Sequence, residues 1–243
     1  HRLLGILGAS AALGDHLCAF PDEWRALATG VWEPSPPSPE QLREILLDAV
    51  GAPTDAGETW GSGGVKARGA GPDVVAELRL IYRRCLLRTV ARDLSDAGPT
   101  GRSDVAMIST ELADLAEATL RAALAVAAAG LPDDAPAVRL GVVGMGKCGG
   151  RELNYLSDVD VVFVFEPGAP GEEFPDIENP GPALRTASAL ASSMMRICKD
   201  VAWQVDAALR PEGKDGPLVR TLASHAAYYK QWARTWEFQA LIK

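Results

Sequence analysis

The sequence lacks the segments that mark membrane and secreted proteins. No apolar run approaches the ~20 residues that a membrane-spanning helix needs, and no apolar leader stands at the N-terminus. We therefore expect a cytoplasmic protein without a membrane segment. The chain starts at His1 rather than at a methionine and ends within an expected helix, so we interpret it as a piece of a longer protein.

Cysteine is scarce, and its spacing excludes two common kinds of site. Cys18, Cys85, Cys148 and Cys198 form no C-x-x-C pair, and no cysteine and histidine cluster has the spacing of zinc ligands. This usage indicates a reduced, intracellular protein. Each cysteine is expected to be a small, buried, apolar residue.

Basic residues are also in short supply. The 24 Lys and Arg residues are outnumbered by 32 Asp and Glu residues, which gives a formal net charge of −8. Proteins that bind DNA or RNA usually carry a basic surface. The charge therefore argues against a nucleic-acid partner.

The chain does contain enough apolar sequence for a sizeable core, because 47% of its 243 residues are hydrophobic. Residues 1–130 are predicted to form a helical N-terminal region with a flexible, glycine-rich loop near 51–71. The helices of this region are expected at 1–27, 39–50, 72–94 and 103–129. Asp22 and Ser38 are the expected N-caps, and Gly130 is expected to end the last helix.

Residues 131–243 are predicted to form the catalytic core. Short β-branched runs indicate buried strands at 140–143 and 159–165, and an alternating pattern indicates a half-buried strand at 201–210. The rest is expected to be an acidic loop at 166–181, a helix at 182–199, a turn at 211–217 and a helix from 224 onward. Helices followed by a small sheet with its own helices predict an α+β fold.

One unbroken stretch, G-M-G-K-C-G-G-R-E-L-N-Y-L-S-D-V-D at residues 144–160, joins the first two of these strands. It places a glycine-rich turn after one strand and two carboxylates at the start of the next. It fits neither the P-loop pattern nor the dinucleotide-binding pattern. The combination predicts a site for phosphate and a divalent metal, which is typical of nucleotidyl transfer.

Asp158 and Asp160 are separated by one residue, and on a strand such residues project to the same face, about 6–7 Å apart. Like charges this close repel unless a cation lies between them, and Mg²⁺ prefers oxygen ligands. Asp206, on the later strand, is predicted to be the third carboxylate of a two-metal site. An ion pair with Arg210 is the alternative for Asp206.

The glycines within residues 144–150 would let backbone N–H groups approach an anion. A helix beginning near residue 150 would add a favourable dipole, and Lys147 would add a point charge. Arg210 and Lys214 are expected either to hold phosphate or to remain solvated.

Four aromatic residues recur at helical spacing near the end of the chain, namely Tyr228, Tyr229, Trp232 and Trp236. We favour core packing for them, with base stacking as the second interpretation. His16 and His225 have no partner at ligand spacing and are given no role.

Residues 144–160 resemble the signature of the glutamine synthetase adenylyltransferase/adenylyl-removing enzymes, bifunctional members of the DNA polymerase β-like nucleotidyltransferase superfamily. Residues 206–218, 228–243 and 13–24 also resemble parts of that family, so the resemblance covers nearly the whole chain except 31–71. It implies a polymerase β-like domain with a small mixed sheet, preceded by a mostly helical region and followed by the start of another.

Enzymes of this family carry two related nucleotidyltransferase domains. One removes AMP from a tyrosine of glutamine synthetase with phosphate and yields ADP, and the other attaches AMP from ATP. The Glu-Leu-Asn-Tyr run at 152–155 and the Leu-Gly-Asp-His run at 13–16 resemble the N-terminal, adenylyl-removing copy, whereas the other copy usually has glycine where Asn154 stands. Cys148 departs from the larger apolar residue or tyrosine expected there.

The resemblance therefore implies magnesium-dependent phosphorolysis that releases ADP, in the regulation of nitrogen assimilation. The alternatives are ATP-dependent adenylylation of the same tyrosine and a non-catalytic, nucleotide-sensing module. The implied partners are glutamine synthetase as protein substrate, phosphate with ADP or ATP, and a nitrogen-signalling regulatory protein, without nucleic acid or membrane.

The resemblance also assigns roles to residues. Three carboxylates would be catalytic and hold Mg²⁺, namely Asp158, Asp160 and Asp206. Gly149, Gly150 and Ser157 would bind the phosphate or the nucleotide. Lys147 and Arg210, predicted from their charge, complete this binding set.

Overall fold

The computed structural model describes residues 2–28, 35–54, 59–60, 64–95, 104–168 and 181–242. The helices are α1 (Arg2–Ala9), α2 (Ala11–Ala19), α3 (Pro39–Ala49), α4 (Pro72–Ser95), α5 (Val105–Ala129), α6 (Gly146–Gly149), α7 (Gly181–Val201), α8 (Leu222–Gln231) and α9 (Thr235–Ala240), with 3-10 helices η1 (Pro21–Leu27) and η2 (Gly213–Asp215). The strands are β1 (Thr59–Trp60), β2 (Val138–Gly144), β3 (Val159–Pro167), β4 (Val205–Asp206) and β5 (Val219–Thr221). The predicted α+β class is confirmed.

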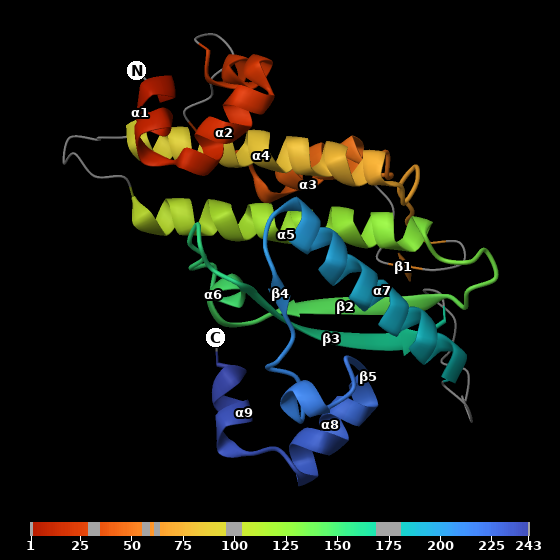
Figure 1. Cartoon of the computed structure of the whole chain (residues 1–243). Helices are drawn as coiled ribbons and strands as arrows, with labels where there is room; N and C mark the ends of the chain where they lie inside the picture. Colours follow the sequence, from red (N-terminus) through yellow and green to blue (C-terminus); the bar gives the residue numbers. More distant parts are fainter. Residues whose placement is uncertain are drawn as a thin grey trace.

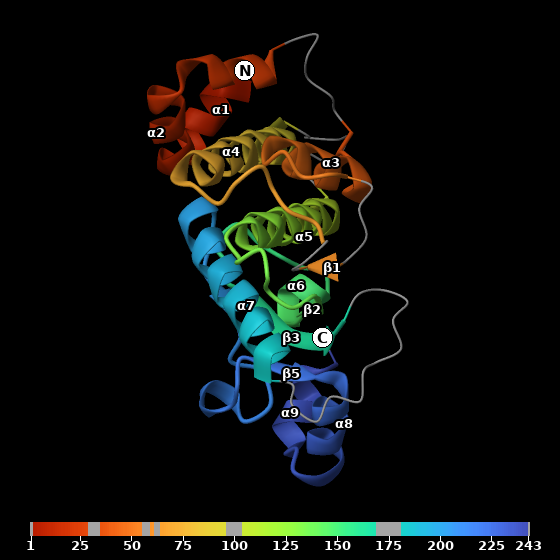
Figure 2. The same ribbon diagram turned by 90° about the vertical axis from the view of Figure 1, so that its right-hand side faces the viewer.

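These elements are stacked in layers, as Figures 1 and 2 show. The N-terminal helices α1 and α2 lie against α4, and α5 lies between α4 and the sheet. Helix α7 crosses the sheet on the same side as α5. Helices α8 and α9 lie at the end of the molecule opposite α1 and α2. The sheet is therefore covered by long helices on one face and flanked by short ones beyond the other.

The start of α3 follows the predicted capping chemistry, but the start of η1 does not. Ser38 accepts a hydrogen bond from the Gln41 N–H, and the Gln41 side chain accepts one from the Ser38 N–H, so the two form a capping box ahead of α3. Asp22 was predicted to be an N-cap, and this is wrong. Pro21 is the first helical residue, which places Asp22 inside the first turn, where it pairs with Arg25 at 2.9 Å.

Helix α5 is the centre of the packing, because most of its residues are buried, including two carboxylates. One of them, Glu111, accepts hydrogen bonds from Thr89 Oγ1 at 2.7 Å and from Arg92 Nε at 3.1 Å, both from α4. The side chains of Arg92 and Glu111 are each only 3% exposed. Removing one partner of such a pair leaves an unpaired buried charge, at a cost of roughly 3–5 kcal/mol, so the pair fixes how α4 and α5 lie together.

One continuous apolar core runs from α3 to β5 and includes both Leu46 of α3 and Phe163 of β3. A second, smaller cluster joins α1, α2 and η1 to α4. Residues on both sides of the expected boundary at 130–131 thus share one core, and the division into two regions stays a prediction from sequence.

The loop expected to be flexible, near 51–71, is described only in part, because residues 55–58 and 61–63 lie outside the described residues. Some of its described residues are packed against the core, and others are exposed. Trp60 in β1 and Val65 are both buried and belong to the main core. The acidic loop expected at 166–181 also falls mostly outside the described residues, at 169–180.

The sheet is mixed, with the order β1-β2-β3-β4, and β5 also pairs with β3. Strands β2 and β3 are antiparallel, with Leu140 opposite Phe165, whereas β4 and β5 both run parallel to β3. Along β3, Val159, Val161 and Phe163 belong to the main core. Because successive side chains alternate between faces, Asp160 lies on the other face, away from α5 and α7.

Several short elements differ from the sequence prediction. The strand expected at 201–210 is reduced to Val205–Asp206, because α7 continues to Val201 and a turn follows Asp206 directly. Strands β1 and β5, of two and three residues, were missed. Core packing is wrong for Trp232 and Trp236, whose side chains are exposed.

Cys85 and Cys198 are buried as expected, whereas burial is wrong for Cys18, which is exposed. Among the described residues, no helix combines the length and the apolar character needed to cross a membrane.

We expect Gly216→Ala to destabilise the fold, because a Cβ at Gly216 would overlap the carbonyl oxygen of Pro211. The free energy of unfolding should fall by about 2 kcal/mol or more. Gly8→Ala in α1 is the matched control, since a Cβ there meets nothing within 4 Å and alanine is favoured in a helix. Thermal unfolding measures both variants, and an unchanged melting temperature for Gly216→Ala would contradict this turn geometry.

Candidate functional site

The glycine-rich turn leaves β2 at Gly144 and packs directly against the start of β3. The Met145 N–H donates to the Asp160 carbonyl at 2.8 Å, which fixes the turn beside that residue. Gly146 has φ +53°, and a Cβ there would lie 3.1 Å from Asp160 Oδ2. Glycine is therefore required at 146 both by the backbone conformation and by the nearby carboxylate.

The predicted phosphate-binding glycines use their N–H groups inside the turn. The Gly149 N–H donates to the Met145 carbonyl at 3.0 Å, and the Gly150 N–H donates to the Gly146 carbonyl at 2.9 Å. The short helix of this turn, α6, spans Gly146–Gly149, so the helix expected to begin near residue 150 is not there. An anion could accept hydrogen bonds from these two N–H groups only if their hydrogen bonds within the turn were broken.

Two side chains after the turn attach it to the long helices. Arg151, which has φ +56°, forms an ion pair with Asp114 of α5. Burial raises the pKa of Asp114, and Arg151 opposes that rise. The Tyr155 hydroxyl donates to Asp93 Oδ2 of α4 at 2.9 Å. Sequence reasoning missed these anchors, because nothing in the local pattern shows which helix residues face the turn.

Asn154 shapes the segment that leads into β3. Its Oδ1 accepts hydrogen bonds from the Leu156 N–H at 3.0 Å and from Ser157 Oγ at 2.9 Å. This side-chain turn holds the hydroxyl of Ser157, the residue that precedes Asp158. A glycine at position 154 would have no side chain to make either bond.

The three predicted carboxylates lie around the start of β3. Asp160 and Asp206 are direct partners in the parallel pairing of β3 and β4, so their side chains share one face of the sheet. Asp158 is exposed, two residues before Asp160. Burial raises the pKa of Asp160, and the charges of Asp206 and Asp158 raise it further, while Lys147 opposes the rise. The charges of these three neighbours thus all act on Asp160.

This arrangement fits a magnesium ion that is held partly by the substrate. Within the described ranges, no three His, Cys, Asp or Glu side chains are placed to hold a metal ion together. Mg²⁺ is usually bound by one or two carboxylates, with waters and substrate phosphates as its other ligands. Asp160 and Asp206 supply such a pair, and their mutual repulsion is what a cation would relieve.

Arg210 is engaged in the turn after β4. Its Nε, Nη1 and Nη2 donate to the carbonyls of Gly216, Ala207 and Lys214 at 3.1, 2.8 and 3.1 Å. In the part of the chain that the structure describes, Arg210 makes no ion pair with Asp206, which was the alternative role for that carboxylate. Arg210 instead stabilises the turn that follows Asp206, and its role in binding phosphate stays a prediction.

The whole chain, residues 1–243, matches the family model described as glutamate-ammonia ligase adenylyltransferase. The chain belongs to this family. The family predicted from residues 144–160 is therefore confirmed, and its description names a nucleotidyltransferase.

The matches to several relatives cover all of this chain. Proteins named bifunctional glutamine synthetase adenylyltransferase/adenylyl-removing enzyme are 50% identical to it in Streptomyces avermitilis, 49% in Nocardia farcinica and 43% in Mycobacterium tuberculosis, in each case over 100% of this chain. The matched part is 21%, 22% and 21% of those proteins. The chain thus spans about a fifth of the length of these relatives.

We expect Asp160→Asn to stabilise the chain when magnesium is removed. Because the pKa of Asp160 is raised in the folded state, ionising this group opposes folding, and stability falls as the pH rises from the unfolded pKa through the folded one. At neutral pH in EDTA, the variant should melt at a higher temperature than the unaltered chain. Excess MgCl₂ should then stabilise the unaltered chain more than the variant.

Differential scanning fluorimetry measures both effects. Asp48→Asn, which changes an exposed carboxylate on α3, is the control and should leave the response to magnesium unchanged. A lower melting temperature for Asp160→Asn in EDTA, or a full response of that variant to magnesium, would contradict the electrostatic account.

Proposed function

We propose that this chain removes AMP from an adenylylated tyrosine of glutamine synthetase by magnesium-dependent phosphorolysis and releases ADP. The observation that carries the proposal is the pairing of Asp160 with Asp206 beside the glycine-rich turn. The names of the relatives supply glutamine synthetase as the substrate. We place the reaction in the cytoplasm, where a nitrogen-signalling protein would control it.

The reaction needs a phosphate oxygen to attack the α-phosphorus of the AMP group in line with the tyrosine oxygen. One P–O bond forms to phosphate, which gives ADP, and the P–O bond to tyrosine breaks, after which the tyrosine oxygen takes up a proton. Tyrosine, with an ordinary pKa of about 10, is a tolerable leaving group. Magnesium, when bound, would neutralise the charge that develops on the phosphoryl and leaving oxygens.

The protein's own residues would bind and orient the reactants. Asp160 and Asp206 would hold the metal from two adjacent strands, whose buried neighbours Val159 and Val205 keep them in place. Lys147, which acts electrostatically on Asp160, is near enough to the site to attract a phosphate. Positioning and charge stabilisation supply most of the catalysis in phosphoryl transfer.

The direction of the reaction is the finer part of the proposal. The relatives are named for both adenylylation and adenylyl removal, and ATP-dependent adenylylation is therefore the second candidate. The side-chain turn at Asn154 supports removal, because the run at 152–155 resembles the adenylyl-removing copy and Asn154 accepts hydrogen bonds from Leu156 and Ser157.

Two parallel incubations decide the direction. In one, the chain receives adenylylated glutamine synthetase, phosphate and MgCl₂, and in the other, unmodified synthetase, ATP and MgCl₂. We expect ADP and unmodified synthetase in the first and no adenylylation in the second. Adenylylation in the second incubation alone would reverse the assigned direction, and no reaction in either would contradict a catalytic role.

Asn substitutions at the carboxylates test the site itself. Asp160→Asn and Asp206→Asn remove charges that the metal needs, and Asp158→Asn removes the nearby third charge. We expect the rate of ADP formation to fall at least a hundredfold, or about 2.7 kcal/mol in transition-state stabilisation, for the first two. Initial rates of ADP formation measure this effect, and Asp48→Asn is the control. A rate within tenfold of the unaltered chain for Asp160→Asn or Asp206→Asn would contradict the assignment.

A further inference from the structure

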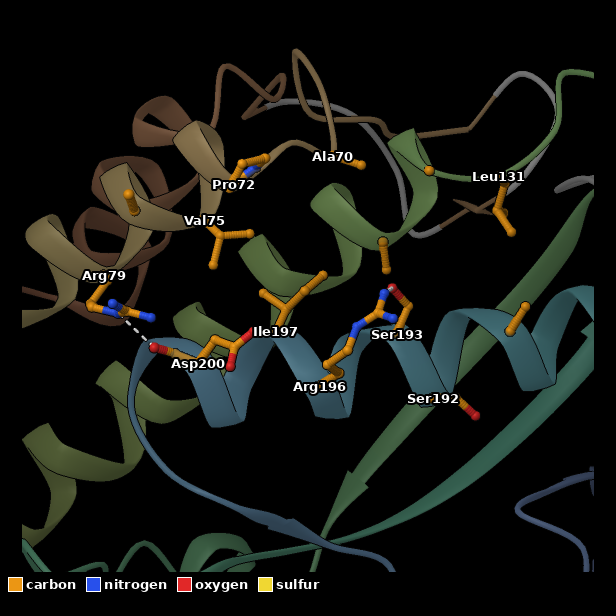
Figure 3. A pocket seen from close by; sticks show the side chains of 14 residues that line it. Ala70, Pro72, Val75, Arg79, Leu131, Ser192, Ser193, Arg196, Ile197 and Asp200 are labelled. Carbon is orange, nitrogen blue, oxygen red and sulfur yellow. Dashed lines mark hydrogen bonds between the residues drawn. The ribbon is translucent and has the colours of Figure 1, made fainter.

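A cleft lies between α4, α5 and α7, and Figure 3 shows it from close by. Its volume is about 720 Å³, which falls in the range of small-molecule sites. Asp158, Asp160 and Asp206 do not line it. The cleft is therefore separate from the proposed catalytic site.

Two guanidinium groups from different helices line this cleft. Arg79 projects from α4 and Arg196 from α7. Arg79 Nε donates a hydrogen bond to the Asp200 main-chain carbonyl at 2.6 Å. Arg196 Nη2 donates one to Ser193 Oγ at 3.1 Å. Within the described ranges, neither arginine forms an ion pair with a carboxylate. Both arginines are exposed, so their guanidinium groups are accessible to a ligand in the cleft.

The remaining walls supply apolar surface and room. Val75 of α4, Ile197 of α7 and Leu131 after α5 are apolar, and Ala127 and Gly130 are small, so the cleft is open between the helices. An apolar wall combined with a few polar groups is typical of sites for small organic ligands. The Asp200 carboxylate also lines the cleft at the Arg79 end, which disfavours a second acidic group there.

We propose that this cleft binds a small organic anion with one acidic group, a phosphate or a carboxylate, and an apolar body. Arg196 binds the acidic group and Arg79 adds the second positive charge, because guanidinium matches the geometry of both kinds of oxyanion. The apolar body packs on Val75 and Ile197. The proposal does not depend on the direction or the existence of the proposed reaction.

Such a ligand would act at the end of α7 that leads to the catalytic strand. Arg79 already joins α4 to the last turn of α7 through Asp200, and β4 begins five residues later at Val205. A ligand held by both arginines would strengthen this connection. A ligand bound there is therefore positioned to influence β4, the strand that carries Asp206.

Titrations of the ¹⁵N-labelled chain with phenyl phosphate and with benzoate test the proposal, followed through the arginine Nε–Hε signals. We expect saturable shifts of the Arg79 and Arg196 signals with at least one probe, and the better probe identifies the preferred acidic group. Benzyl alcohol, which is neutral, and inorganic phosphate, which has no apolar body, should each bind at least tenfold more weakly.

Three variants complete the test. Arg196→Gln should weaken binding at least tenfold, or about 1.4 kcal/mol, with an unchanged melting temperature, whereas Arg185→Gln, on the same helix but outside the cleft, should not. Asp160→Asn should bind the probe normally, which separates this site from the proposed reaction. No saturable shift, equal binding by Arg196→Gln, or equal binding of benzyl alcohol or inorganic phosphate would overturn the proposal.

Discussion

The site depends on one constraint, the parallel pairing that sets Asp160 beside Asp206. Adjacent strands lie about 4.8 Å apart, so two carboxylates on one face at paired positions repel each other. Burial raises the pKa of Asp160 first, and the charges of Asp206 and Asp158, which repel its ionised form, raise it further. A fold that keeps such a pair must hold the two strands together by other interactions, and a cation is the simplest group to neutralise them.

Those other interactions are found on the opposite face of the sheet and around the turn. Val159 and Val205, which alternate with the two aspartates, are buried in the main core under α5 and α7. The ion pair of Arg151 with Asp114 and the hydrogen bond of Tyr155 with Asp93 attach the turn to α5 and α4. The helical region thus contributes directly to positioning the carboxylates, which explains why the core continues across residue 130.

Much of this could be predicted from sequence, because it depends on local chemistry. The capped helix after Ser38, the two long helices, the strands on either side of residues 144–160 and the α+β class all follow from spacing and composition. Sequence placed Asp160 and Asp206 in one site, but it did not predict that the two residues are direct partners in adjacent strands. Its register depends on where α7 ends and on the turn after Asp206, and neither leaves a periodic pattern.

The residues that sequence reasoning missed act over long separations. Asp93 and Asp114 lie in helices whose patterns are dominated by apolar burial, and only the folded chain shows that they face the turn. The same holds for Arg210, whose three main-chain acceptors come from a turn that brings residues 207–216 together. Glycine spacing suggested free N–H groups at 149 and 150, whereas the turn uses both internally.

Anomalous diffraction from crystals of the chain soaked in manganese, which replaces magnesium in oxygen-ligand sites, tests the central claim most directly. The account predicts a peak between the carboxylates of Asp160 and Asp206, next to the turn at Gly146. A manganese peak elsewhere and none between these two side chains would contradict it.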